Sequence, residues 1–284
     1  MDSTPPVAVQ VVLYRSSRWL PKLVRGLERL EYPRERLRVR MLNNSPGDGS
    51  RELLEALSPR LTLEYEDSAE GNLGFGRAHN LLAARAGADT EHLLLLNPDA
   101  IPFHDCLLRL VDRAARAPRP ALVEACQFPN EHPKVHDPAT GETGWCSAAC
   151  LLVRTDVFAE LGGFDDRIFL YCEDVDLSWR AWLAGHRCVF EPAARCVHVT
   201  QHGDHGKDLS NEIYHGYVGG LFVRQRYFGE ASVERYTEAM RAAAPADVAE
   251  RALRTFATIR PRTLAAAHPL IVDLPDLNYA PLRW

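Results

Sequence analysis

The stretch HLLLLNPDAI, residues 92–101, places a run of leucines directly before Asn97, Pro98 and Asp99. A continuous apolar run is typical of a strand that is buried on both faces, as the strands of parallel sheets are. In open α/β sheets, ligands bind at the carboxyl ends of such strands, where polar side chains are found. The stretch therefore predicts an inner strand of a parallel sheet with a ligand site at its exit.

The sequence on both sides of this stretch alternates between strand and helix patterns. Strands are predicted at residues 7–14, 39–44, 61–66, 147–154 and 186–192, and helices at residues 20–30, 50–57, 77–87, 155–164 and 173–185. This alternation predicts an α/β fold with a mainly parallel sheet and helices on both of its faces. Residues 127–145 are interpreted as a long surface loop. Three helical stretches near 209–228, 232–243 and 245–257 precede a proline-rich tail.

The composition excludes several classes of protein. The 284 residues carry 33 basic and 38 acidic side chains, a formal charge of −5, so no nucleic-acid-binding surface is expected. Seven cysteines without a CxxC pair favour neither a disulfide framework nor a zinc ribbon, and they suit a reducing cytoplasm. No apolar run approaches the ~20 residues of a spanning helix, and the N-terminus lacks a signal-peptide pattern. We therefore expect a cytoplasmic protein with at most peripheral contact at the inner face of the cell membrane.

The polar exit at residues 97–99 suits a metal ion. A carboxylate at the end of a central strand can hold Mg²⁺ or Mn²⁺, and such a cation neutralises a diphosphate. The alternative is a structural turn, in which Pro98 fixes φ and Asp99 caps the following helix. The stretch alone leaves both interpretations open.

Two further loops follow predicted strands. NNSPGDGS, residues 43–50, offers short amide and hydroxyl side chains that can read the edge of a nucleobase, and a glycine-rich turn capped by Ser50 is the alternative. GNLGFGRAHN, residues 71–80, has glycines that permit close backbone approach to a ligand, and Arg77 or His79 offers charge for a phosphate. Its glycine spacing does not match GxGxxG, which disfavours a dinucleotide-binding fold.

Three acidic residues open a predicted helix in FLYCEDVDLSWR, residues 169–180. Acids at a helix start complement the helix dipole, and Asp176 has Arg180 one turn away as a partner. Glu173 and Asp174 are adjacent carboxylates next to an apolar stretch. Such a setting raises the pKa of a carboxyl toward the range of a general base.

Histidines gather in CVHVTQHGDHGK, residues 196–207. A structural zinc site at His198, His202 and His205 is disfavoured, because glycines break the helical spacing and no fourth ligand lies nearby. His198, at the end of a strand, is the better candidate for a single ligand to the same metal as Asp99. Residues 201–207 are interpreted as a mobile lid.

These motifs, in this order over about residues 7–200, resemble the inverting glycosyltransferases of family 2, and especially their bacterial rhamnosyltransferase-like branch. The matching stretches are VVLY, LNNSPGDGS, NLGFGRAHN, LLLLNPD, the segment from Leu151 to Pro192, His198, and YHGYVGGLFVRQRYFG in the C-terminal part. The resemblance implies the Rossmann-like GT-A fold, a mixed, mainly parallel sheet flanked by helices. It further implies a catalytic domain at 1–206 and a C-terminal helical extension and tail at 207–284.

The resemblance also implies roles for single residues. Asp174, with Glu173 as second choice, takes the acceptor proton, and Trp145 and Glu173 line the acceptor side. Asp99 and His198 hold Mg²⁺ or Mn²⁺. The residues that border the nucleotide-sugar are Leu13, Tyr14, Asn43, Asn44, Asn72, Gly74, Arg77, His79, Asn97 and Asp99.

Three positions depart from the family pattern. Asn97 replaces the first acid of the usual DxD motif, and Asn43 replaces an Asp that often reads uracil or thymine. Ala148 replaces a glycine common after the tryptophan. The first departure bears on metal binding, the second on the choice of base, and the third on the shape of the acceptor pocket.

The implied activity is the transfer, with inversion, of a sugar such as rhamnose or a related deoxysugar. The donor is of the dTDP, UDP or GDP type, and the acceptor is a glycan or lipid-linked hydroxyl in polysaccharide, O-antigen or other glycoconjugate synthesis. A sugar nucleotidyltransferase, one alternative, needs a glycine-rich basic loop after the first strand, where this chain has YRSSRW. The other alternative is a non-catalytic nucleotide-sugar binding module, in which the acids at 173 and 174 are helix caps.

Overall fold

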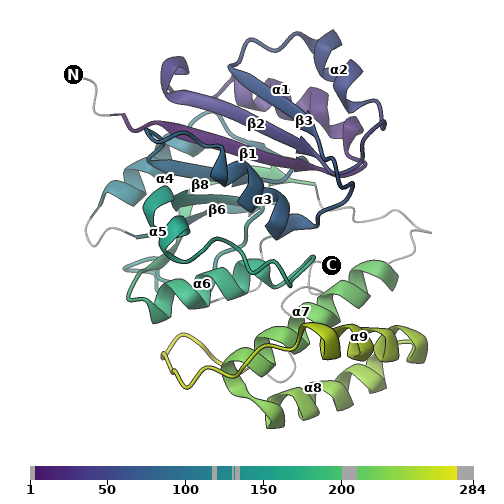
Figure 1. The fold of residues 1–284 in the computed structure, drawn as a ribbon. Helices are drawn as coiled ribbons and strands as arrows, with labels where there is room; N and C mark the ends of the chain where they lie inside the picture. Colours follow the sequence, from purple (N-terminus) through teal and green to yellow (C-terminus); the bar gives the residue numbers. More distant parts are fainter. Residues whose placement is uncertain (1–3, 117–119, 130, 132–134, 200–209, 274–284) are drawn as a thin grey trace.

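An eight-stranded sheet forms the centre of the first two hundred residues (Figure 1). The structure is a computed structural model, and it describes residues 4–116, 120–129, 131, 135–199 and 210–273. The strands are β1 Val7–Leu13, β2 Leu37–Asn43, β3 Leu63–Asp67, β4 His92–Leu96, β5 Ala100–Pro102, β6 Leu122–Phe128, β7 Cys150–Arg154 and β8 Cys188–His198. They stand in the order β3-β2-β1-β4-β7-β6-β8-β5.

The sheet has a parallel half and a mixed half. β3, β2, β1 and β4 are parallel neighbours, as the alternation of strands and helices predicts. β7 runs antiparallel to both β4 and β6, and β5 runs antiparallel to β8, whereas β6 and β8 are parallel. The predicted fold class, a mixed and mostly parallel sheet between helices, is confirmed.

Helices cover both faces of this sheet. One face carries α1 Leu20–Glu28, α2 Ser50–Leu57 and α4 Cys106–Ala115, and the other carries α3 Phe75–Ala84, α5 Thr155–Glu160 and α6 Glu173–Leu183. The short helices η1 Ser17–Trp19 and η2 Arg34–Arg36 lie in the connections around α1. In β1, Val9 and Val11 pack toward the first face, while Ala8 and Val12 pack toward the second. Burial on both faces explains why β1 and β4 are apolar along their length.

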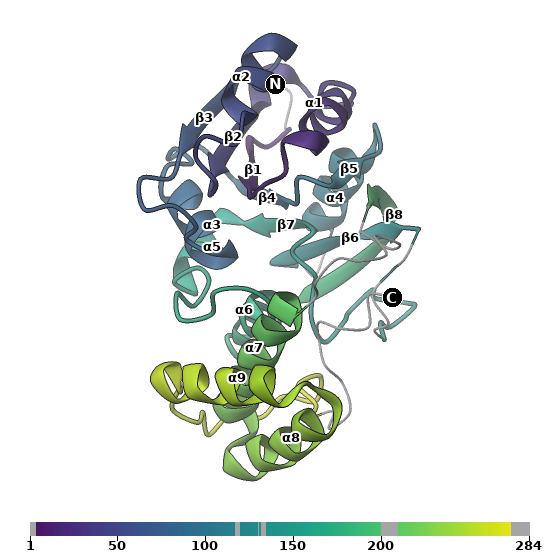
Figure 2. The same cartoon turned by 90° about the vertical axis from the view of Figure 1, so that its right-hand side faces the viewer.

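Three C-terminal helices form a separate layer beside α6 (Figures 1 and 2). They are α7 Ser210–Phe228, α8 Glu230–Ala243 and α9 Ala246–Ile259, and they share an apolar cluster of their own. The ring of Trp179 in α6 meets the rings of Tyr227 and Phe228 in α7, with centroids 4.8 Å and 5.6 Å apart. The predicted helical extension is therefore packed against the sheet domain through α6. The predicted boundary at residue 206 lies outside the described residues.

The sequence prediction missed several elements and ended one strand too early. The strands β5 and β6 and the helix α4 were not predicted, although α4 has an inward apolar face of Cys106, Leu107 and Leu110. The last two residues of β6 lie in the predicted loop at 127–145. The last predicted strand, at 186–192, continues to His198. The loop at 127–145 is anchored, because Glu142 forms a bridge with Val189 of β8.

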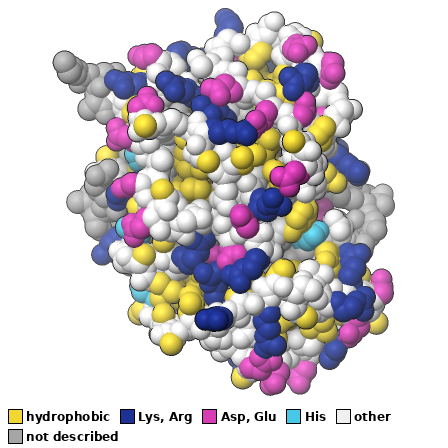
Figure 3. Space-filling model, in the orientation of Figure 1, with side chains coloured by type: hydrophobic (Ala, Val, Ile, Leu, Met, Phe, Trp, Pro, Cys, Tyr) yellow, Lys and Arg dark blue, Asp and Glu magenta, His cyan; other side chains and the backbone are white. Residues whose placement is uncertain are grey.

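The surface carries charges of both signs. On the face shown in Figure 3, basic and acidic side chains lie intermingled with apolar ones. Across the described residues, no helix combines the length and the apolar character that a membrane crossing requires.

Candidate active site

The exit of β4 and the end of β8 form one polar corner. After β4 the chain turns into β5, where Ala100 pairs with His198 of β8. This pairing places His198 Nε2 3.4 Å from Asp99 Oδ1 and 3.4 Å from Asn97 Nδ2. Three site residues predicted from two distant segments, Asn97 and Asp99 from one and His198 from the other, thus lie together.

The corner fits a divalent cation. Two ligand atoms of one octahedral cation lie about 3 Å apart, because each bond is about 2.1 Å long and neighbouring ligands meet at right angles. Asp99 Oδ1 and His198 Nε2 are close to this separation. The His198 side chain is 2% exposed and that of Asp99 is 22% exposed, so the pair is open on the carboxylate side. Among the described residues, no group of three or more His, Cys, Asp or Glu side chains could hold a metal ion.

Helix α6 begins after a turn of unusual backbone conformation. Tyr171 and Cys172 both have φ of +67°, in the left-handed region that costs a non-glycine residue about 1 kcal/mol or more. Gly219 of α7 lies against this turn, since a Cβ on Gly219 would stand 2.3 Å from the carbonyl oxygen of Tyr171. The C-terminal layer therefore supports the turn that presents Glu173 and Asp174.

Two backbone amides orient the side chain of Asp174. Its Oδ1 accepts the N–H of Val175 at 2.9 Å, and its Oδ2 accepts the N–H of Ala148 at 3.2 Å. The next residue, Ala149, accepts the N–H of Asn97 through its carbonyl oxygen at 2.9 Å. Two consecutive alanines thus join the candidate base to the candidate metal corner.

The three acids at the start of α6 have different surroundings. Asp176 is fully buried, and its carboxylate accepts hydrogen bonds from Arg180 Nε and from the Tyr227 hydroxyl, both at 2.8 Å. The predicted partnership of Asp176 with Arg180 is confirmed, and it belongs to a network that joins α6 to α7. Glu173 is buried, at 5% exposure, whereas Asp174 is partly exposed. Of the three, Asp174 is the most accessible to an acceptor.

The carboxyl ends of β1 and β2 lie side by side. The N–H of Asn44 donates to the carbonyl of Leu13 at 2.7 Å, and the N–H of Arg15 donates to Ser45 Oγ at 2.8 Å. The side chain of Leu13 is fully buried, so a ligand at this edge meets its backbone. Tyr14, by contrast, is 47% exposed at the surface of the same edge.

Asn43 lies at the centre of a partly buried polar cluster. Its Nδ2 lies 3.0–3.2 Å from the carbonyl of Ser45, Asp48 Oδ1, the Tyr65 hydroxyl and Asp67 Oδ1. The side chain is fully buried, so its amide organises the loop around it. Direct reading of a base by Asn43 stays a prediction.

The cluster adds Asp48, Tyr65 and Asp67, which the sequence analysis did not name as site residues. Burial raises the pKa of the Asp67 carboxyl, but hydrogen bonds from Arg51, Tyr65 and Asn43 outweigh burial and leave that pKa below its usual value. Asp67 is therefore charged at neutral pH. Its position at the end of β3, opposite Asn43 at the end of β2, is the signal that could have identified it.

The glycine-rich loop packs against the segment that precedes α6. Gly74 has φ of +81°, and a Cβ there would stand 2.3 Å from the carbonyl oxygen of Phe169. That oxygen accepts the N–H of Phe75 at 2.9 Å, while the carbonyl of Gly74 accepts Asn44 Nδ2 at 2.9 Å. Asn72 Oδ1 caps the N–H of Gly74 at 3.0 Å. Glycine is therefore required at position 74 for close backbone packing.

Arg77 and His79 differ in burial on α3. Arg77 is exposed and pairs with Glu70 at 3.5 Å. His79 is fully buried, its Nδ1 lies 3.1 Å from Gln10 Oε1, and its ring centroid lies 4.4 Å from that of Phe75. Burial lowers the pKa of His79 to about 3, so the ring is neutral at physiological pH. The prediction that His79 offers charge to a phosphate is corrected, because the helix turns it into the core.

Trp145 packs half-buried against the apolar cluster that joins α6 to α7, a cluster that includes Trp179 and Phe222. Its predicted place on the acceptor side remains a prediction. The predicted lid at 201–207, with His202 and His205, lies outside the described residues.

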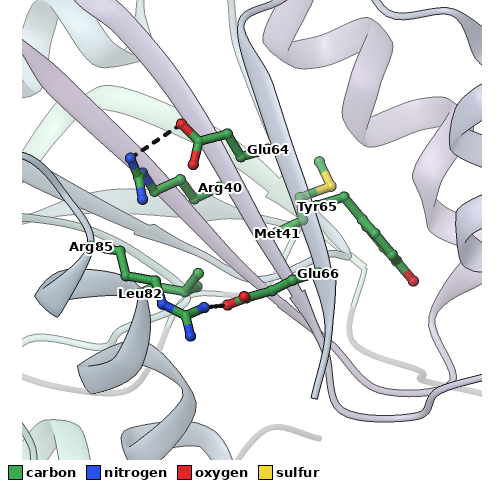
Figure 4. Close-up of a pocket in the computed structure, with 7 residues that line it drawn as sticks. All are labelled: Arg40, Met41, Glu64, Tyr65, Glu66, Leu82 and Arg85. Atoms are coloured by element: carbon green, nitrogen blue, oxygen red, sulfur yellow. Dashed lines mark hydrogen bonds and ion pairs between the residues drawn. The ribbon is translucent and has the colours of Figure 1, made fainter. Parts of the chain in front are cut away.

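A cavity of about 120 Å³ opens between β2, β3 and α3 (Figure 4). It is bordered by the ion pair of Arg40 with Glu64, at 3.2 Å, and by that of Arg85 with Glu66. The remaining lining residues are Met41, Tyr65 and Leu82. The predicted site residues are not among them.

The chain is similar in sequence to bacterial rhamnosyltransferases. Rhamnosyltransferase WbbL of Escherichia coli strain K12 is 30% identical over 167 residues, which cover 46% of this chain and 63% of that protein. N-acetylglucosaminyl-diphospho-decaprenol L-rhamnosyltransferase of Mycobacterium tuberculosis strain CDC 1551 is 27% identical over 254 residues, covering 74% of this chain and 82% of that protein. No model of a known protein family matches the chain.

Solved structures of glycosyltransferases share its fold. A mannosyltransferase from Pyrobaculum calidifontis, in complex with GDP-Man and Mn²⁺, superposes with a TM-score of 0.62 at 18% identity, over 91% of this chain and 74% of the other. GalNAc-T7 with UDP, GalNAc and Mn²⁺ gives a TM-score of 0.67 at 13% identity, over 91% of this chain and 56% of the other. These likenesses confirm the predicted GT-A fold, and the sequence relatives confirm the resemblance to rhamnosyltransferases.

Proposed function

We propose that this chain transfers a sugar from a nucleoside diphosphate to an acceptor hydroxyl, with inversion at the anomeric carbon. The chain has the glycosyltransferase A fold, and bacterial rhamnosyltransferases are similar to it in sequence. One observation carries the proposal: Ala148 donates to the carboxylate of Asp174, and Ala149 accepts from Asn97. Sugar transfer needs a charge-neutralising corner for a diphosphate and a proton acceptor beside it. Ala148 contacts the candidate proton acceptor, Asp174, and the adjacent Ala149 contacts Asn97 of the polar corner.

The donor is proposed to lie along the ends of β1, β2 and β3. The loops there offer the exposed Tyr14, the charged Asp67 and the backbone around Gly74. The names of the relatives specify rhamnosyl transfer, and the mycobacterial name includes N-acetylglucosaminyl-diphospho-decaprenol. These names support rhamnose or a related deoxysugar as the transferred group. They also support a glycan or lipid-linked acceptor, met at the surface of a membrane.

Asp99 and His198 are proposed to bind Mg²⁺ or Mn²⁺. Two of the similar structures contain Mn²⁺ together with a nucleotide or nucleotide-sugar. A divalent cation at this corner supplies positive charge to the diphosphate leaving group. Asn97, a neutral residue, stands at a position where an acid is common in the family, so this corner carries less negative charge toward the diphosphate.

The proposed chemical step is a single displacement. An acceptor hydroxyl approaches the anomeric carbon from the face opposite the diphosphate, and Asp174 takes its proton. The acceptor oxygen bonds to the anomeric carbon, the bond from that carbon to the diphosphate oxygen breaks, and its electron pair leaves with the diphosphate. Attack from the opposite face inverts the anomeric configuration.

A thermal-shift screen of dTDP-, UDP- and GDP-sugars, each with and without Mn²⁺, tests donor binding, because a ligand of the folded state raises its stability. We expect one nucleotide series to stabilise the chain more in the presence of Mn²⁺. Incubation of that donor with lipid-linked and glycan acceptors then tests transfer, and NMR of the product gives the anomeric configuration. Donor binding without transfer or donor hydrolysis would favour a binding module, and retained configuration would contradict the single displacement.

A further inference from the structure

His198 has a different partner at each ring nitrogen. Nε2 faces Asp99 Oδ1 and Asn97 Nδ2, both at 3.4 Å, whereas Nδ1 lies 2.7 Å from Gln127 Oε1. A carbonyl oxygen can accept a hydrogen bond and cannot donate one, so Nδ1 carries the hydrogen. In the neutral ring, Nε2 then presents its lone pair to the corner.

The orientation of the Gln127 amide is itself fixed. Its Nε2 lies 3.4 Å from Glu124 Oε1 on the same strand, and a carboxyl oxygen accepts hydrogen bonds. The flipped amide would set its oxygen against the carboxylate of Glu124 and its NH₂ group toward His198. Glu124 is fully buried and Gln127 is 3% exposed, so both contacts are shielded from bulk solvent.

A strand irregularity brings Gln127 to His198. β6 pairs with β8 in parallel as far as Ala125 opposite Glu191, and the register then shifts so that Cys126 faces Arg195. The shift passes over residues 192–194 of β8 and leaves Gln127 opposite Cys196, two residues before His198. The backbone N–H of Gln127 also donates to Glu131 Oε2 at 2.7 Å, which holds this end of β6.

We infer that Gln127 is a positioning residue that sets the tautomer of His198, with Glu124 orienting the amide of Gln127. The consequence for a metal rests on the proposed function, because Asp99 and His198 must share a cation for the Nε2 lone pair to matter. In the other tautomer, Nε2–H points at the cation position and His198 is lost as a ligand. Partners of this kind typically change metal affinity about 10- to 100-fold when removed.

The first test uses the metal-free protein with ¹⁵N-labelled histidine at mildly alkaline pH. We expect NMR to show a hydrogen on Nδ1 and none on Nε2 of His198 in the parent, with the signals assigned by their loss in His198→Asn. In Gln127→Met the ring should shift toward the Nε2–H form. The double variant Glu124→Gln with Gln127→Glu exchanges carboxylate and amide, keeps an acceptor for Nδ1–H, and should restore the parent tautomer. An unchanged tautomer in Gln127→Met would overturn the inference.

The second test measures Mn²⁺ affinity by electron paramagnetic resonance, with thermal unfolding to establish that each variant is folded. Gln127→Met should bind Mn²⁺ about 10- to 100-fold more weakly than the parent, and the exchanged pair should bind within a few-fold. Gln10→Met is the matched control, because it removes the same kind of partner from another buried histidine, His79. Should Gln127→Met be too unstable, Gln127→Asn shortens the amide so that it cannot reach the ring.

The outcomes separate the two proposals. A tautomer change with weakened Mn²⁺ binding supports both. The same tautomer change in a chain whose parent does not bind Mn²⁺ supports the role of Gln127 and overturns the metal site of the proposed function. Equal loss of Mn²⁺ affinity in Gln127→Met and Gln10→Met overturns the specific role of Gln127.

Discussion

The N–H of Ala148 donates to Asp174 Oδ2 at 3.2 Å, so the first turn of α6 is tied to the segment that enters β7. Each carboxylate oxygen of Asp174 accepts one backbone hydrogen bond, Oδ1 from Val175 and Oδ2 from Ala148. The backbone amides of Ala148 and Val175 thereby orient the side chain of Asp174.

Replacement of Asp174 by Asn should lower turnover by about 10² to 10⁴ with little change in donor affinity, because the amide retains the size of the carboxylate and loses its basic oxygen. Steady-state kinetics and donor titration measure the two quantities. Glu173→Gln is the matched control, since it alters the neighbouring, more deeply buried acid. A nearly active Asp174→Asn beside an inactive Glu173→Gln would transfer the role to Glu173, and activity in both would refute the mechanism.

Replacement of Asp99 by Asn should weaken donor binding mainly when Mn²⁺ is present, because the lost charge belongs to the proposed cation ligand. Donor titrations with and without Mn²⁺ give the comparison. Asn97→Asp, which adds an acid at the same corner, should keep activity or tighten Mn²⁺ binding. Equal donor binding by Asp99→Asn and the parent in Mn²⁺ would argue against a metal here.

Replacement of Tyr227 by Phe should lower the free energy of unfolding by about 1–3 kcal/mol, because the buried carboxylate of Asp176 loses a hydrogen bond. Donor affinity should stay near that of the parent, since this network joins helices behind the site. Urea denaturation measures the change, with Tyr217→Phe as a second buried tyrosine of α7 for comparison. A loss no larger than that of Tyr217→Phe would show that the bond contributes little.

Replacement of Gly219 by Ala should lower kcat about 10- to 100-fold, because the new methyl group displaces the Tyr171 carbonyl and the turn before Asp174. Gly220→Ala adds the same methyl one residue later, where it meets the Tyr236 hydroxyl at 2.6 Å in the helical layer. Both variants should be less stable, and kcat should fall mainly in Gly219→Ala. Similar kcat values for the two variants would contradict a specific role of the turn.

The pH dependence of stability should report the burial of His79. Its pKa is near its usual 6.5 in the unfolded chain and about 3 in the folded protein, so between these values the unfolded state binds an extra proton. This histidine therefore costs the folded state about 1.4 kcal/mol of stability for each pH unit below 6.5. His79→Gln lacks this dependence, so its stability deficit relative to the parent should shrink from about pH 7 to about pH 4. Urea denaturation across this range tests the sign, and a constant deficit would contradict it.

The elements of the fold were predictable because their patterns are local. Apolar runs such as Leu93–Leu96 and spaced leucines such as those of α1 are visible within a few residues. β5 was missed because three residues carry too short a pattern. The direction of β7 was not predictable either, since it depends on which strands pair across the sheet.

The residue types of the site could be predicted from the sequence, but the contacts between these residues mostly could not. Asn97, Asp99 and His198 could be selected as metal or phosphate ligands, but their meeting depends on the pairing of β5 with β8. Gln127 gave no signal, because its partner lies 71 residues away and its segment resembles the start of a loop. His79 was misjudged because charge at neutral pH depends on burial, and the phase of α3 decides that burial.

The pairing of Ala100 with His198 has a consequence for how the chain folds. Asn97 and His198 lie 101 residues apart, and closing a loop of this size delays contact formation during folding. The corner cannot exist before β8 has reached the sheet. A cation that binds at this corner therefore binds only chains in which β8 has joined the sheet. Titration of a preparation with metal would then measure the fraction of such chains.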